Sequence, residues 1–389
     1  MRQKVCAVKI LFLFFLFFTH SCQESPERKP LLKLFKKKEK RLSEKEIAKK
    51  AAILEDYFCN LQERRGFNGV VLVAKGTQII LKKPFGYKNF RTKEPLAVDA
   101  VFQLASVSKQ FTSAAIMLLQ QRGLLNYEDS VQKFFPDFPY KGITVHQLLT
   151  HQSGLTNYAY FCDKVWDRKK TISNENVLCL MTMHKPIPYY QPGVRYDYSN
   201  TGYMLLASIV EKVSKMKFED FVRHNIFLPA RMFNSYVYNH GVPIEISNVV
   251  EGYNGGRRRK AGKTYLDGVL GDKGVYSTVE DLYKWDRALY SELVLCDTTL
   301  ETAFTPVFKK RKKRDNYGYG WRIKDYHGDK VVWHSGWWEG YKTIFLRNLK
   351  DETVIIVLTN SLIGHLKSNV LLDAYYEKRI DENQEEDAD

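Results

Sequence analysis

Ser106 and Lys109 are two side chains whose types and spacing could carry out covalent chemistry. They lie three residues apart at the expected start of a helix, where residues at this spacing share a face and can touch. A serine hydroxyl becomes a nucleophile when a base takes its proton, and lysine is a base only as a neutral amine. The reference pKa of lysine is about 10.4, and burial beside the positive end of a helix lowers it. We therefore expect Ser106 to be the acylated nucleophile and Lys109 to be the base that activates it.

The same spacing recurs at Ser214 and Lys217, so spacing alone does not identify a site. The second copy falls near the end of an expected helix, among lysines, and we interpret it as structural. Taken alone, the first copy would be better explained as a polar helix start. The chemical interpretation therefore depends on what else the sequence contains.

Further motifs accompany Ser106 in a definite order. They are Phe102–Lys109 (FQLASVSK), Leu148–Leu155 (LLTHQSGL), Pro192–Gly202 (PGVRYDYSNTG), Gly271–Thr278 (GDKGVYST, followed by Asp281 and Leu282) and His334–Gly336 (HSG). With these segments, the region from about Phe102 to Asn360 resembles the serine β-lactamase and penicillin-recognising enzyme superfamily. The likeness is strongest to the branch of class C β-lactamases, D-alanyl-D-alanine carboxypeptidases and esterases.

The resemblance implies a role for each matched residue. Tyr198 would be the general acid/base that relays a proton among Ser106, Lys109 and the leaving group. The amide of Asn200 would bind the substrate and the Lys109 ammonium. The backbone N–H groups of Ser106 and Trp337 would form the oxyanion hole. The expected substrate-binding residues are Asn200, His334, Ser335, Gly336 and Trp337.

Two segments depart from the family pattern. His334 stands where many relatives have lysine, which weakens the fixed positive charge and with it the recognition of a substrate carboxylate and the hydrolysis of β-lactams. Asp272 and Lys273 stand where many relatives have small residues. They would form a local ion pair or border the site, and we leave them out of the catalytic set.

The first residues of the chain predict export. A positive start at Arg2, Lys4 and Lys9 precedes an unbroken apolar run, Ile10–Phe18. That run is shorter than the roughly 20 residues that span a bilayer, so it is typical of a cleaved signal. Ser21-Cys22 resembles a lipoprotein cleavage site, which implies a lipid on Cys22 and a membrane-anchored protein in the cell envelope. The alternative is an ordinary secretory signal that contains a cysteine.

The net charge of +16 is concentrated in three clusters, at 28–50, 257–263 and 309–314. The summed charge of the three clusters exceeds the net charge of the whole chain, so the rest of the chain is slightly acidic. The clusters are separate and the first flanks the expected membrane anchor, which favours an anionic envelope surface over nucleic acid, and we do not expect nucleic acid as a partner. The second and third clusters are better explained as solvated loops. We also expect no cofactor, no metal site and a monomer.

Four cysteines, at 59, 162, 179 and 296, lack CxxC spacing and are either disulfide-bonded or free thiols.

The order of expected elements predicts an α/β fold. A capping box at Ser43–Glu46 begins a helix that runs to about Arg64, and Gly69–Lys83 reads as a hairpin. Helical periodicity dominates the middle of the chain, and strands return at 331–336, 341–347 and 353–359, before a last helix at about 366–380. Strands at both ends predict one antiparallel sheet of the five-stranded type, flanked by helices, with a mainly helical subdomain.

These expectations divide the chain into a signal peptide (1–21), a basic tether (22–42), one hydrolase domain (43–380) and an acidic tail (381–389). Within the domain, the sheet part covers about 43–100 and 265–380, and the helical part about 101–264. The predicted function is an exported, lipid-anchored serine hydrolase that acts on amide or ester carbonyls of cell-wall D-amino-acid peptides, esters or β-lactams. The alternative is a catalytically weak penicillin-binding or peptidoglycan-binding envelope lipoprotein.

Overall fold

The computed structural model describes residues 41–238, 247–255, 258–308, 316–363 and 366–378. The expected signal peptide, the lipidation site at Cys22, residues 22–40 of the tether, the basic cluster at 309–314 and the acidic tail lie outside these ranges.

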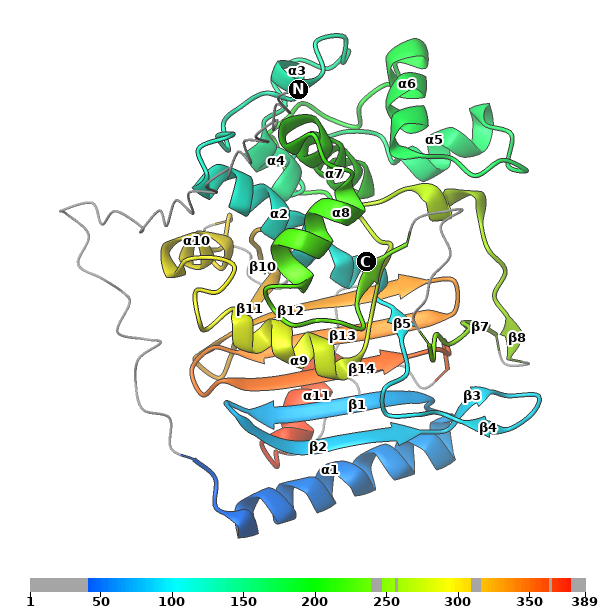
Figure 1. Ribbon diagram of the computed structural model, residues 1–389, viewed down its shortest axis with the longest axis vertical. Helices are drawn as coiled ribbons and strands as arrows, with labels where there is room; N and C mark the ends of the chain where they lie inside the picture. The colour runs from blue at the N-terminus through cyan, green and yellow to red at the C-terminus, as the bar shows by residue number, and fades with distance from the viewer. Residues whose placement is uncertain (1–40, 239–246, 256–257, 309–315, 364–365, 379–389) are drawn as a thin grey trace, which may run out of the picture.

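An antiparallel sheet of seven strands, in the order β10-β11-β12-β13-β14-β1-β2, forms the base on which the site is built (Figure 1). The first and last long strands, β1 and β14, pair from Gly69↔Thr359 to Lys75↔Thr353, so the two ends of the domain close the sheet as expected. The hairpin of β1 and β2 is confirmed. The strands are β1 (Gly69–Lys75), β2 (Gln78–Phe85), β10 (Asn316–Tyr317), β11 (Arg322–Tyr326), β12 (Asp329–Trp338), β13 (Tyr341–Asn348) and β14 (Thr353–Thr359).

The expected antiparallel sheet flanked by helices is confirmed, and β10 and β11 extend it beyond the five-stranded type. Short strands form three smaller sheets. One of them, β5-β9-β6, contains the strand that directly precedes the turn with Ser106. Their bounds are β3 (Tyr87–Asn89), β4 (Glu94–Pro95), β5 (Phe102–Gln103), β6 (Tyr236–Val237), β7 (Tyr253–Asn254), β8 (Arg259–Lys260) and β9 (Val275–Ser277).

Helices bury both faces of the large sheet (Figure 1). On β1, Val71 and Val73 pack toward α1 (Glu44–Arg65) and α11 (Ser368–Tyr375). Val70 and Leu72 belong to the opposite core, which contains α2 (Lys109–Gln121) and α9 (Val279–Ala288). Burial on both faces explains why this strand is a continuous apolar run instead of an alternating one.

The helical subdomain lies against α2, whose residues from Lys109 to Leu119 are all buried. Its longest helix, α7, packs on α2 and on α4. The remaining helices are α3 (Val131–Phe134), α4 (Val145–Leu149), α5 (Tyr158–Val165), α6 (Asn174–His184), α7 (Asn200–Ser214), α8 (Phe218–Val222) and α10 (Asp297–Ala303), with shorter turns at Ala105–Ser108, Arg223–Phe227 and Tyr265–Gly268. In the described ranges, none of the helices has both the length and the apolar character needed to cross a membrane.

The capping box at the start of α1 is confirmed: Ser43 and Glu46 satisfy each other's backbone N–H groups, and Gly66 ends the helix in the left-handed conformation. The described part of the last helix is shorter than expected. Cys59, Cys162, Cys179 and Cys296 are free thiols, the second of the two alternatives.

A buried ion pair joins α9 to the sheet. Arg347 of β13 donates from Nε to Oδ1 of Asp286 at 2.5 Å, and both side chains are about 1% exposed. Arg287 shares the same carboxylate and also pairs with Glu352. Removing one member of a buried pair strands the other charge away from water.

We therefore predict that Asp286→Ala lowers the free energy of unfolding by about 3–5 kcal/mol, measured by urea denaturation. The matched control is Glu377→Ala, which removes solvent-exposed pairs with Lys49 and Lys50 and should lower the free energy of unfolding much less. Equal effects from the two variants would contradict a structural role for the buried pair.

Candidate active site

Ser106 is presented by a tight turn between β5 and α2. The turn, Ala105–Ser108, is a 3-10 helix, so the α-helix proper begins at Lys109 and not at Ser106. Ala105 has a φ of +50°, a left-handed conformation that costs energy in a residue with a side chain. Ser108 Oγ accepts a hydrogen bond from the backbone of Val275 at 3.1 Å, which fixes the turn against β9. Ser106 itself is partly exposed.

Lys109 lies under Ser106 with no exposed surface. Its Nζ is 2.9 Å from each of three oxygens: Ser106 Oγ, Asn200 Oδ1 and the backbone oxygen of Asp272. Burial lowers the pKa of Lys109 to about 7; the charge of Asp272 raises the pKa, while Lys273 and Arg322 lower it.

The three oxygens are not equivalent partners. The oxygens of Asn200 and Asp272 can only accept, whereas the Ser106 hydroxyl can also donate. A neutral amine has two N–H groups and one lone pair. With the N–H groups directed at the two obligatory acceptors, the lone pair is left for the proton of Ser106.

Tyr198 and Asn200 reach the site from the start of α7. Ser199 between them is the N-cap, and its Oγ accepts from the backbone of Gly202 at 3.3 Å. Ser106 is close enough to the Tyr198 hydroxyl to lower the pKa of Tyr198, and Lys109 Nζ lies 4.8 Å from the centre of the Tyr198 ring. Burial raises the pKa of Tyr198 well above its usual value, against the opposing charge of Arg322. Tyr198 is therefore a neutral phenol.

The His334–Gly336 motif lies on β12. Strand β12 lies inside the sheet, between β11 and β13, but β11 pairs with it only as far as Trp333, so from His334 to Trp338 its pairing is with β13. Gly336 leaves no room for a side chain, because a Cβ there would lie 2.3 Å from the backbone oxygen of Leu104. Ser335 is partly exposed, and Trp337 is 59% exposed.

His334 is buried and neutral. Its Nδ1 donates to the backbone oxygen of Ser335 at 2.5 Å, which leaves Nε2 to accept from the Tyr317 hydroxyl at 3.0 Å. Burial lowers the pKa of His334 well below its usual value, and the charges of Arg322 and Lys109 lower it further. The side chain therefore carries no fixed charge, and it faces Tyr317 instead of solvent.

The sequence did not point to several residues at the site. Arg322 lies 5.5 Å above the ring of Tyr198, at the start of a strand with no alternating pattern. The ring of His151, from the Leu148–Leu155 segment, lies 4.3 Å from the same ring at a tilt of 38°, and its Nδ1 accepts from the backbone of Ser199 at 3.0 Å. That motif was recognisable, but the contact of its histidine with Tyr198 was not.

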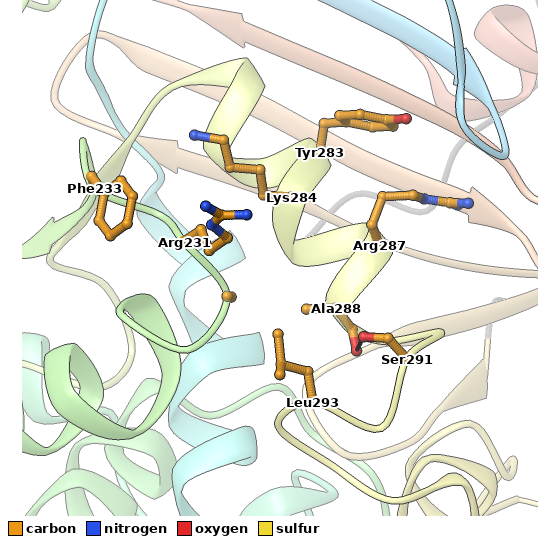
Figure 2. A pocket seen from close by; sticks show the side chains of 9 residues that line it. Arg231, Phe233, Tyr283, Lys284, Arg287, Ala288, Ser291 and Leu293 are labelled. Carbon is orange, nitrogen blue, oxygen red and sulfur yellow. Dashed lines mark hydrogen bonds between the residues drawn. The ribbon is translucent and has the colours of Figure 1, made fainter.

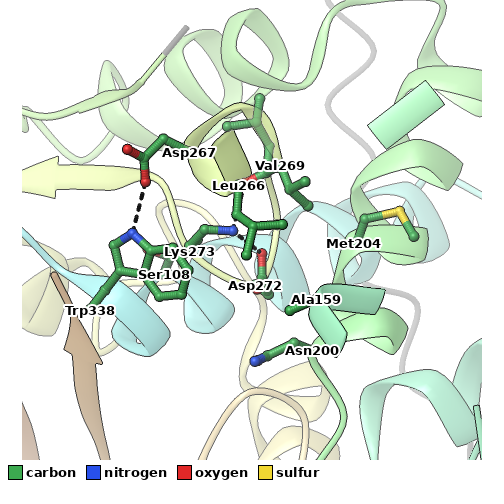
Figure 3. A network of polar contacts seen from close by, with 12 residues as sticks. Ser108, Ala159, Asn200, Met204, Leu266, Asp267, Val269, Asp272, Lys273 and Trp338 are labelled. Atoms are coloured by element: carbon green, nitrogen blue, oxygen red, sulfur yellow. Dashed lines mark hydrogen bonds and ion pairs between the residues drawn. The ribbon is translucent and has the colours of Figure 1, made fainter. Parts of the chain in front are cut away.

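Asp272 and Lys273 were expected either to form a local ion pair or to border the site, and they do both. They form a buried ion pair at 3.4 Å, and the pair borders the site through the Asp272 carbonyl (Figure 3). Figure 3 also shows the Trp338 indole donating to Asp267, at 2.9 Å. Among the described residues, no group of three or more His, Cys, Asp or Glu side chains is placed to hold a metal ion.

A surface hollow of about 540 Å³ lies away from these residues (Figure 2). It lies between α9 and the segment 230–233, and Arg231, Phe233, Lys284 and Leu293 are among its lining residues. None of the motif residues lines it. The candidate site therefore rests on the convergence of chemical groups and not on the size of a cavity.

Comparison with known proteins identifies the family. A family model described as Beta-lactamase matches residues 54–375. The chain belongs to the beta-lactamase family. Penicillin-binding protein 4* of Bacillus subtilis is 37% identical over 320 residues, which cover 79% of this chain and 71% of that protein. The expected class, a serine hydrolase of this superfamily, is confirmed.

Solved structures of similar proteins share the fold. The octameric penicillin-binding protein homologue from Pyrococcus abyssi has a TM-score of 0.74 and 27% identity, over 85% of this chain and 78% of that one. The monomer expected for this chain stays a prediction. The D-amino acid amidase from Ochrobactrum anthropi SV3, complexed with L-phenylalanine amide, has a TM-score of 0.69 and 22% identity, over 85% and 97% of the two chains. At that identity the likeness concerns the fold alone.

We predict that Gly336→Ala slows ester hydrolysis by about 100-fold, because the new Cβ pushes on Leu104 and shifts the turn that carries Ser106. The rate with p-nitrophenyl acetate would measure this. Gly262→Ala, whose Cβ meets nothing within 4 Å, is the matched control and should keep the parental rate. A parental rate in both variants would mean that the close approach does not position the turn.

Proposed function

We propose that this protein is an exported, lipid-anchored serine hydrolase that cleaves amide or ester carbonyls through an acyl-enzyme on Ser106. The observation that carries the proposal is the contact of Lys109 Nζ with Ser106 Oγ at 2.9 Å, in a place where burial brings the pKa of Lys109 to about 7. A base works best when its pKa is near the working pH.

In the first step, the neutral amine of Lys109 takes the proton of Ser106, and Oγ bonds to the substrate carbonyl carbon. The carbonyl oxygen becomes an oxyanion, which the backbone N–H groups of Ser106 and Trp337 would hold. Gly336 allows the substrate to approach the strand that precedes Trp337. Asn200 keeps Lys109 aimed at Ser106 by accepting one of its N–H groups.

In the second step, the bond between the carbonyl carbon and the leaving group breaks. Tyr198 is a neutral phenol close to Ser106, so it can give its proton to the leaving nitrogen or oxygen. Tyr198 then recovers a proton from the Lys109 ammonium. Water attacks the acyl-enzyme, its proton returns through the same two groups, and Ser106 leaves with a proton. The net reaction consumes one water and releases a carboxylic acid and an amine or alcohol.

For the substrate class, we propose cell-wall peptides or amides that contain D-amino acids, with carboxylic esters as further substrates. The name of one similar protein, a penicillin-binding protein, supports the choice of cell-wall peptides. The neutral state of His334 argues against efficient β-lactam hydrolysis, because the strand lacks the fixed cation that many relatives place there.

Labelling with a fluorophosphonate tests the proposal. Ser106 Oγ would displace fluoride from phosphorus, and mass spectrometry of peptides would find the adduct on Ser106. Ser106→Ala should abolish the adduct. Ser214→Ala is the matched control: it removes the serine of the other Ser-x-x-Lys copy, whose hydroxyl donates to the backbone of Val210, and labelling should be unchanged.

An adduct that survives Ser106→Ala would overturn the proposal. A panel of D-amino-acid amides, short esters and a chromogenic cephalosporin separates the two candidate functions. Repeated turnover supports the hydrolase, whereas a single burst of product without turnover supports the weak penicillin-binding protein.

We also propose a cleaved signal at 1–21, a tether at 22–42 and a lipid on Cys22, supported by the short apolar run and by Ser21-Cys22. Cells fed a labelled fatty acid should transfer the label to the wild-type protein and to Cys59→Ala, but not to Cys22→Ala. Label on Cys22→Ala, or none on the wild type, would contradict the anchor.

A further inference from the structure

Asp272 and Lys273 form an ion pair that is cut off from solvent. Their side chains are 3% and 4% exposed, and Lys273 Nζ lies 3.4 Å from Asp272 Oδ1 (Figure 3). A charge buried this far is costly unless a partner and hydrogen bonds compensate it.

The hydroxyl of Tyr158, at the start of α5, closes the pair into a ring of contacts. It donates to Asp272 Oδ2 at 2.9 Å and accepts from Lys273 Nζ at 2.7 Å. Burial, together with the Asp272 charge, raises the pKa of Tyr158 well above its usual value, so the hydroxyl remains a donor. Lys273 also donates to the backbone of Val269 at 3.2 Å and lies 4.7 Å from the ring of Trp338. Its ammonium is thus engaged by the protein.

The backbone at this pair is fixed between two helices of the site. Thr112 of α2 donates to the carbonyl of Gly271 at 2.7 Å. Gly271 has a φ of +103°, and a Cβ there would lie 2.4 Å from the backbone oxygen of Tyr203 on α7. The next carbonyl, that of Asp272, accepts from Lys109 Nζ at 2.9 Å.

We propose that Asp272, Lys273 and Tyr158 form a positioning unit that holds the Lys109 amine through the Asp272 carbonyl and balances the charge around it. The proposal rests on the proposed role of Lys109 as base. None of the three touches Ser106, so they act through Lys109.

The two charges of the pair act on Lys109 in opposite directions: Asp272 raises its pKa and Lys273 lowers it. The other groups that face Lys109 come from several elements. They are Arg322 of β11, which lowers its pKa, the buried His334 of β12, His151 after α4, and Tyr198, Asn200 and Tyr203 at the start of α7. None of these is changed by a substitution within the pair, so removing one member leaves the other unbalanced.

The test is the rate of fluorophosphonate labelling of Ser106 as a function of pH. The neutral amine is the active form, so the wild-type rate should rise through a midpoint near 7. Lys273→Met leaves the carboxylate unbalanced, which favours the ammonium and should move the midpoint up by about one unit. Asp272→Asn leaves the ammonium of Lys273, which should move the midpoint down by a similar amount and make labelling at pH 6 faster relative to the plateau.

The double variant Asp272→Asn/Lys273→Met keeps the backbone and removes both charges, so its midpoint should return to near the wild-type value. Lys273→Arg keeps the charge and should keep the profile. Lys284→Met is the matched control, because it removes a lysine from a pair with Asp281 on α9, away from Lys109. Thermal melting identifies the variants that fold, and the direction of the shift in any folded single variant decides the result.

Opposite shifts, cancelled in the double variant, support the positioning unit. Shifts in the same direction, or none in folded variants that still label on Ser106, overturn it, because a purely structural role changes the plateau and not the midpoint. Absence of labelling in the wild type would instead overturn the proposed function, so the two failures are distinguishable.

Discussion

The burial of one amine is the constraint around which the site is arranged. Lys109 begins a helix that has no solvent-facing side along its first three turns, and its Nζ can meet only protein atoms. Burial of an amine favours its uncharged form. Two of its three oxygen partners can only accept, which leaves its lone pair toward Ser106. The same packing that stabilises α2 in the core thus supplies the chemistry proposed for Ser106.

Segments far apart in sequence hold that amine in place. The start of α7 brings Asn200 and Tyr198, the turn at 271–274 brings the Asp272 carbonyl, and β12 approaches the Ser106 turn at Gly336. Each approach depends on a residue with an unusual local demand. Gly271 adopts a conformation reserved for glycine, and Gly336 has no room for a Cβ. Backbone placement, more than the length of side chains, therefore determines the geometry.

The parts of this arrangement that could be predicted are those written in local patterns. The capping box before α1, the hairpin of β1 and β2, and the motifs at Ser106, Tyr198 and His334 are short, contiguous signals. Strand β11 was missed because 322–326 mixes charged and aromatic residues without alternation. Arg322 and Tyr158 were missed for a different reason: their partners lie far along the chain, and no spacing within a segment reports such a contact.

The account is tested most directly by measuring the charge of Lys109. An NMR titration of its side-chain ¹³Cε and ¹⁵Nζ resonances, assigned by comparison with Lys109→Arg, reports the state of the amine without any substrate. The account predicts a midpoint near 7. An amine that is still an ammonium at about pH 9, close to the reference behaviour of lysine, would contradict it.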